Sequence, residues 1–318
     1  MNFSNCPKLC DLLPAGALSL TATLWLAPVL SSHGVGIGRT FPSPDDAVRA
    51  LASALNSHDS NSLAAIFGPG FEEIENPDPV QEQNELATFS ERLNESRHLE
   101  RDGTDRYILE IGKDHWPFAI PIVKTGGSWF FDTEAGDDEL LSRRVGRNEL
   151  DALKSIRAYV DAQRQYASID RNSDQVLQYA QKILSTPGAR DGLYWPTDSD
   201  GEESPLGPLF AEAQSKGYFK NPQAANAPQP FNGYYFKILT RQGRHAPGGK
   251  YSYVVNGHMI GGFALVAWPA EYRNSGVMTF IVNQRGVVYQ RDLGPKTGKL
   301  AANMDTYDPG PGWMQSQD

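Results

Sequence analysis

The chain has 318 residues, 40% of them hydrophobic, which is enough for two domains of ordinary size with real cores. It carries 29 basic and 38 acidic residues, a net charge of -9, and no basic run longer than Arg143-Arg144. Nucleic-acid and anionic membrane partners are disfavoured, because binding to their phosphates draws on concentrated positive charge.

Residues 1–38 are predicted to be a signal peptide or an N-terminal anchor. Residues 12–30 are almost all apolar or small, and Lys8 precedes them. Export with cleavage is favoured over an uncleaved membrane anchor, because Pro14 and Pro28 interrupt the apolar run. The predicted location is therefore periplasmic or extracellular.

Both cysteines of the chain, Cys6 and Cys10, lie inside this segment, so the mature protein would have no thiol or disulfide. Lipidation is rejected. Lipoprotein signals place a small residue before an acylated cysteine at the end of the apolar run, whereas Leu9 precedes Cys10 and the run comes after it.

Residues 41–145 are predicted to form an N-terminal α+β domain. Ser43 as N-cap and Pro44 at the first helical position indicate a helix start. A second short helix begins at Ser60 and ends before the Gly-Pro-Gly at 68–70. A polar helix at about 80–93 and three strands follow, at 107–111, 118–123 and 129–132, with a turn at 125–128 between the last two.

Residues 148–318 are predicted to form a second α+β domain. Asn148 is the expected N-cap of a helix whose apolar stripe faces a sheet; the stripe consists of Leu150, Leu153, Ile156, Val160 and Ala167. Strands rich in β-branched and aromatic residues follow at 234–239, 251–255, 262–268, 277–282 and 287–291. The predicted fold class is thus α+β: N-terminal helices on a small antiparallel sheet, then a long helix packed on an antiparallel β-meander.

A long crossing, residues 185–231, joins that helix to the strands and contains a short helix at 208–215. Long connections are often functional, and exposed Tyr and Trp concentrate at binding sites. We therefore place a ligand-binding surface where the loop 191–196 meets the sheet, formed by Asp191, Tyr194, Trp195, Tyr234 and Tyr235. The alternative is that Tyr194 and Trp195 plug the end of the sheet.

Several blocks carry a resemblance to a known family, among them YVDAQRQYA at 159–167, DGLYWP at 191–196, VVNGHMIGGFALV at 254–266 and SGVMTFIVNQ at 275–284. Over essentially all of residues 41–313 the chain resembles an uncharacterised family of exported bacterial proteins, domain of unknown function 2950. The resemblance implies export and no particular activity.

The second half is also similar to the globular heads of pilins and pseudopilins, which have a helix with an Ala-Gln-x-x-Tyr-Ala segment, here at 162–167, an irregular loop and a meander. Those heads sit directly on an apolar helix that polymerises. In this chain residues 41–145 separate the apolar N-terminal segment from the half that resembles a pilin head, so the likeness concerns the fold only.

Catalytic and metal-binding patterns are weak throughout. The six histidines are scattered without ligand spacing, no G-x-S-x-G or Ser-x-x-Lys occurs, and no cofactor is expected. Residues 170–174 open like a calcium loop, but Gln175 stands where that loop needs glycine. The acidic segment 198–203 is interpreted as a solvated loop, so no metal site is predicted.

The favoured function is a non-enzymatic envelope or secreted protein that binds another protein or a small ligand. The alternatives are an accessory component of a secretion or pilus apparatus, and an enzyme of unrecognised type with a pocket in the N-terminal domain. Such a pocket would be lined by Trp116, Phe118, Trp129 and Phe131, unless these residues simply fill the core.

Overall fold

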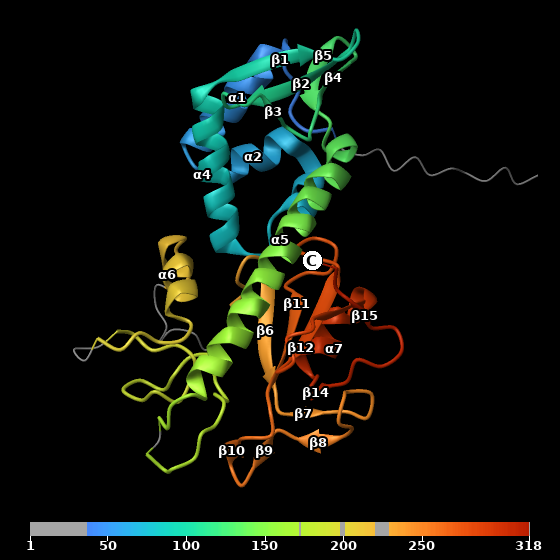
Figure 1. Ribbon diagram of the computed structural model, residues 1–318. Helices are drawn as coiled ribbons and strands as arrows, with labels where there is room; N and C mark the ends of the chain where they lie inside the picture. Colours follow the sequence, from blue (N-terminus) through green and yellow to red (C-terminus); the bar gives the residue numbers. More distant parts are fainter. Residues whose placement is uncertain (1–36, 172, 198–200, 220–228, 318) are drawn as a thin grey trace, which may run out of the picture. The chain divides into compact units, whose positions relative to one another are not determined.

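The computed structural model describes residues 37–171, 173–197, 201–219 and 229–317 (Figure 1). The predicted signal peptide or anchor lies outside the described residues except for its last two, and both cysteines lie outside them as well. Within the described ranges, no helix has the length and apolar character needed to cross a membrane.

The N-terminal helices begin where the local sequence predicts. The hydroxyl of Ser43 accepts a hydrogen bond from the backbone N–H of Asp46 at 3.1 Å, which caps the first helix as expected. The second helix ends at Phe67, where Gly68 has a φ of 73° that few other residues tolerate. The helices are α1 (Pro44–Asn56), α2 (Ser60–Phe67), the 3-10 turn η1 (Gly68–Gly70), α3 (Phe71–Ile74) and α4 (Pro79–Glu95).

These helices pack on an antiparallel sheet with the order β1-β2-β4-β5 and β3 paired to β2. The predicted turn joins β4 to β5, with Gly126 and Gly127 at φ of 56° and 90°. The predicted strand 118–123 is wrong over its first half, because Phe118 and Ile120 point into the core from irregular backbone. The strands are β1 (Arg97–Arg101), β2 (Arg106–Ile111), β3 (Trp116–Pro117), β4 (Ile122–Thr125) and β5 (Ser128–Phe131).

The longest helix, α5, runs from Thr133 to Tyr166, and its N-cap lies 16 residues before the predicted one. Its N-cap is Asp132, whose carboxylate accepts from the N–H of Ala135 at 3.3 Å, so the assignment of Asn148 as N-cap is wrong. The predicted boundary between the two domains falls inside this helix. Leu150, expected in the apolar stripe, is 69% exposed, whereas Leu153, Ile156 and Val160 are buried as expected.

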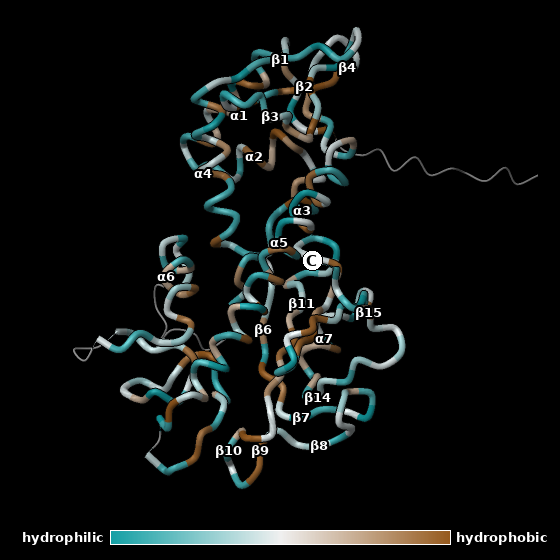
Figure 2. Tube along the Cα trace, in the orientation of Figure 1, coloured by the Kyte–Doolittle hydropathy of each residue, from teal (hydrophilic) through white to brown (hydrophobic). Residues whose placement is uncertain are grey.

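The second half forms the predicted antiparallel meander, in the order β15-β13-β12-β11-β6. Strand β11, which lies between β12 and the edge strand β6, is buried along its whole length. Helix α5 packs over β11 and β12 (Figures 1 and 2). The hydroxyl of Tyr159 on α5 lies 3.1 Å from the carbonyl oxygen of Ala264 on β11 and donates to it. The strands are β6 (Tyr234–Leu239), β11 (Ala264–Pro269), β12 (Met278–Asn283), β13 (Tyr289–Asp292) and β15 (Met314–Gln315).

Smaller elements complete this half. The predicted strand 251–255 is split in two because Tyr253 turns inward and is fully buried between the pieces. The predicted short helix in the crossing is present as α6 (Gly207–Ser215). The remaining elements are β7 (Arg241–Gln242), β8 (Tyr251–Ser252), β9 (Val254–Val255), β10 (His258–Met259), η3 (Gly294–Lys296), α7 (Thr297–Ala302) and β14 (Thr306–Tyr307).

The chain has a large hydrophobic core in each half, and the strands of the two halves form separate sheets. The α+β fold class is thus confirmed. The division into domains at 41–145 and 148–318 stays a prediction, since α5 is continuous through the boundary.

Candidate functional site

The loop 191–196 does not present the exposed aromatic surface that was expected. Trp195 is only 4% exposed, and its indole N–H donates to the carbonyl oxygen of Glu202 at 3.3 Å. The guanidinium of Arg171 lies 5.0 Å from the centroid of the Trp195 ring, and that of Arg190 lies 5.8 Å from it. The expectation that Trp195 is exposed is therefore wrong, because two cations and a backbone acceptor already satisfy the indole.

Asp191 and Tyr194 are also engaged within the chain. Asp191 accepts from the N–H of Thr186 at 2.7 Å and from Nζ of Lys182 at 2.5 Å. Partial burial raises the pKa of Asp191, but these hydrogen bonds outweigh it and lower the pKa to about 2. Tyr194 stacks on Phe210 with 4.0 Å between ring centroids. These contacts hold the turn in one conformation.

The two sheet tyrosines differ in burial. Tyr234 is fully buried and donates its hydroxyl to the carbonyl oxygen of Met278 at 2.9 Å, so the expectation that it is exposed is wrong. Tyr235 is half-buried, with its ring 5.6 Å from that of Trp268. Trp195 and Tyr234 belong to the same hydrophobic core, and the loop contributes to that core.

A pocket of about 600 Å³ lies elsewhere, between α4 and α5. Each helix turns one side toward it. From α4 the lining residues are Gln81, Glu82, Asn84, Glu85, Leu86, Thr88, Phe89 and Arg92, and from α5 they are Leu140, Arg143, Arg144, Arg147 and Asp151. The helices are joined across one end by an ion pair between Glu85 and Arg147.

Apolar side chains form the floor of the pocket. They come from α1, α2 and α3 and include Leu51, Leu55, Leu63, Phe67, Phe71 and Ile74. Leu86, Phe89, Trp116 and Leu140 are only partly buried against this core. Of the four aromatic residues considered for such a pocket, Trp116 and Phe118 line it, whereas Trp129 and Phe131 are buried in the core. A mostly apolar concavity with a few polar groups is typical of a small-molecule site.

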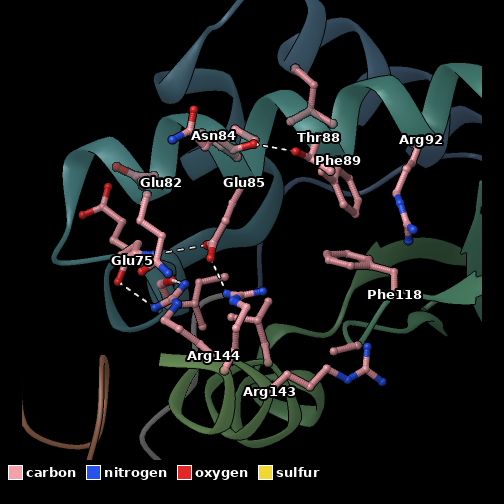
Figure 3. Close-up of a pocket in the computed structure, with 18 of the residues that line it drawn as sticks. Glu75, Glu82, Asn84, Glu85, Thr88, Phe89, Arg92, Phe118, Arg143 and Arg144 are labelled. Atoms are coloured by element: carbon pink, nitrogen blue, oxygen red, sulfur yellow. Dashed lines mark hydrogen bonds and ion pairs between the residues drawn. The ribbon is translucent and has the colours of Figure 1, made fainter. Parts of the chain in front are cut away.

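The polar groups of the pocket are arranged in two sets (Figure 3). Glu75 and Glu82 lie beside Arg144 at one end, and Arg92 and Arg143 lie on either side of Phe118 at the other. Burial raises the pKa of Glu82, and the neighbouring charge of Glu75 raises it further. A second negative charge is therefore disfavoured at the Glu82 end.

Arg144 is a structural residue at the edge of this pocket. It is 6% exposed and donates to the carbonyl oxygens of Ile74 at 2.6 Å and Glu75 at 3.1 Å, and to Oδ1 of Asn274 at 2.5 Å. Burial lowers the pKa of Arg144, although the group remains a cation at neutral pH. It caps the C-terminal end of α3 and links it to the turn before β12.

A chain of buried amides runs beside Arg144 from the pocket to the second sheet. Asn76 donates to Gln81 at 3.0 Å, Gln81 donates to Asn148 at 2.7 Å, and Asn148 donates to the carbonyl oxygen of Ser275 at 2.9 Å. Asn148, predicted as a helix cap, therefore connects α4, α5 and the turn before β12. Such amides are satisfied only when all three elements are in place.

Neither candidate calcium loop gathers a ligand set among the described residues. Carboxylate oxygens of Asp170 and Asp174 accept from the backbone N–H groups of Gln175 and Val176 at 2.8 and 2.9 Å. Glu202 pairs with Arg171 and Arg190. Residues 172 and 198–200 of these loops lie outside the described residues. In the part of the chain that the structure describes, no group of three or more His, Cys, Asp or Glu side chains could hold a metal ion.

Comparison with known proteins identifies a family but no function. The family model described as protein of unknown function (DUF2950) matches residues 38–316. No curated protein and no solved structure matches the chain. The likeness to pilin heads therefore gains no support from a solved fold.

Proposed function

Since the chain belongs to the DUF2950 family, whose description assigns no activity, we propose its function from the pocket: it is an exported, non-enzymatic protein that binds a small, mainly apolar ligand between α4 and α5. The observation that supports this proposal is the half-covered apolar wall of Leu86, Phe89 and Leu140 above the apolar floor. Apolar surface left in water costs about 25 cal/mol per Å², and a ligand would remove that cost.

A dye-binding experiment tests the pocket. Nile red, a neutral dye that fluoresces in apolar surroundings, is expected to bind the folded protein. Leu86→Trp should abolish most of the signal, because the larger side chain fills the space beside Phe89. The matched control is Leu150→Trp on α5, where the leucine is 69% exposed and lies outside the pocket. Equal dye binding by both variants and the wild type would count against the proposal.

Export is supported by the apolar run at 12–30 and the polar stretch after it. We expect mature protein recovered from the envelope fraction or the medium to begin between about Ala27 and Thr40, because signal peptidase cleaves just beyond the apolar segment. Sequencing of its N-terminus measures this. Recovery of chains that begin at Met1 from the cytosol would contradict export.

A second candidate function is an enzyme that uses the Glu82 end of the pocket. The raised pKa of Glu82 favours it, since carboxyl groups whose pKa is raised by burial are typical of general acids. Mass spectrometry of material extracted from protein purified from its own host distinguishes the two. A binding protein should give the same bound compound in the wild type and in Glu82→Gln, whereas an enzyme should accumulate unconverted substrate in the variant only.

A further inference from the structure

The charges at the Phe118 end of the pocket indicate the chemistry of the ligand. Arg92 ends the pocket-facing stripe of α4, and Arg143 stands on α5 (Figure 3). The guanidinium of Arg143 lies 4.9 Å from the centroid of the Trp116 ring, and its Nη1 donates to the carbonyl oxygen of Pro117 at 2.9 Å. These contacts fix Arg143 before any ligand arrives, which lowers the entropic cost of binding.

Both arginines keep donors available. Nε of Arg143 donates to Glu139 at 2.7 Å and Nη2 of Arg92 donates to Asp114 at 3.1 Å. Each of these acidic side chains is 57% exposed, and exposed ion pairs contribute little stability. Within the described part of the chain, Nη2 of Arg143 and Nη1 of Arg92 have no hydrogen-bond partner. Each of these free Nη groups can donate a charge-assisted hydrogen bond to a carboxylate oxygen.

The opposite end of the pocket disfavours a second negative charge on the ligand, although Arg144 and Arg147 also line it. Glu75, Glu82 and Glu85 stand there, and Glu85 already pairs with Arg147. An anionic group placed beside Glu82 would meet like charge in partly desolvated surroundings. The floor between the two ends is apolar, so the remainder of the ligand must be uncharged.

We infer that the pocket binds a fatty carboxylate, with its head group at the end that carries Arg92 and Arg143 and its alkyl chain over Phe89 toward the apolar floor. This inference rests on the proposed function, because it specifies the ligand of the same pocket. A volume of about 600 Å³ lies within the range of pockets that enclose ligands of this size.

The test compares three probes of equal chain length by titration calorimetry: decanoate, 1-decanol and decyltrimethylammonium. Decanoate is expected to bind roughly tenfold to a hundredfold more tightly than 1-decanol, because charge-assisted hydrogen bonds contribute free energies that correspond to such factors in affinity. Arg143→Gln and Arg92→Gln should each remove about that factor for decanoate and leave the affinity for 1-decanol unchanged. The control is Arg164→Gln, also on α5, whose guanidinium pairs with Asp161 outside the pocket.

The outcomes separate this inference from the proposed function. Equal affinities for decanoate and 1-decanol, or no effect of either arginine substitution, would overturn the carboxylate site and leave the apolar pocket in place. Preference for decyltrimethylammonium would also overturn it, and would point to the Glu82 end. If no probe binds and Nile red does not bind, the proposed function itself fails. Nile red binding by both Arg→Gln variants shows that they are folded.

Discussion

Replacement of Asp78 by alanine is expected to lower the free energy of unfolding by roughly 3–5 kcal/mol. Asp78 is 1% exposed and lies at the N-terminus of α4. Its Oδ2 accepts from the hydroxyl of Tyr218 at 2.8 Å and from the N–H of Gly233 at 3.0 Å. Each donor left buried without an acceptor costs about 1–3 kcal/mol, and loss of the helix cap adds about 1 kcal/mol.

Urea unfolding measures this difference. The control is Asp132→Ala, which removes the cap of α5 but only one hydrogen bond, so a loss of about 1 kcal/mol is expected. Burial raises the pKa of Tyr218, so its hydroxyl stays protonated and donates to Asp78 throughout the usual pH range. Tyr218→Phe should therefore cost much less in the Asp78→Ala background than in the wild type. Additive effects would show that the two side chains act independently.

Substitution by alanine at two glycines of α5 is expected to change the free energy of unfolding in opposite directions. A Cβ at Gly136 would lie 2.6 Å from Cα of Ile120 and 2.7 Å from the carbonyl oxygen of Ala119, both of them backbone atoms. Gly136→Ala should therefore lower the free energy of unfolding by about 2–3 kcal/mol through overpacking. A Cβ at Gly146 would meet nothing within 4 Å, so Gly146→Ala should raise it by about 0.5–1 kcal/mol through helix propensity.

Thermal and urea unfolding of these two variants check this pair of predictions. Each variant is the control for the other, because helix, substitution and change in intrinsic propensity are the same. A gain in stability at both positions would mean that α5 can move away from the segment that contains Ala119 and Ile120, and that close packing at Gly136 is not needed.

Local signals were the part of the fold that the sequence predicted well. The cap at Ser43, the end of α2 before Gly68 and the turn at Gly126 and Gly127 each depend on a few adjacent residues. Strand β1 was missed because it lies at the edge of its sheet with most of its side chains exposed, which leaves no alternation to detect. For Trp195 the alternative holds, since it is buried in the core, and the sequence could not decide between the two possibilities because Arg171, which covers the indole, lies on a different segment.

A pocket in the N-terminal half was expected from Trp116 and Phe118, but the start of α5 and the part that α5 plays in this pocket were missed for a common reason. The pocket-facing residues of α5 are mostly charged, and they lie about 120° around the helix axis from the residues that face the second sheet, so no single apolar stripe runs along the helix. A signal did exist, since Arg143, Arg144 and Arg147 recur at helical spacing, as do Glu82 and Glu85. Only the fold shows that the face of α4 with Glu82 and Glu85 lies opposite the face of α5 with the three arginines.

The two differently oriented faces of α5 also limit how the length of this chain can change. One residue inserted between Arg144 and Ala152 would rotate everything after it by about 100°, turning Ile156 and Tyr159 away from the second sheet. Seven inserted residues would restore the orientation to within about 20°, but they would lengthen the helix by about 10 Å and break the hydrogen bond from Arg144 to Asn274. Insertions and deletions are therefore excluded from this stretch, and length variation belongs in surface turns such as 125–128.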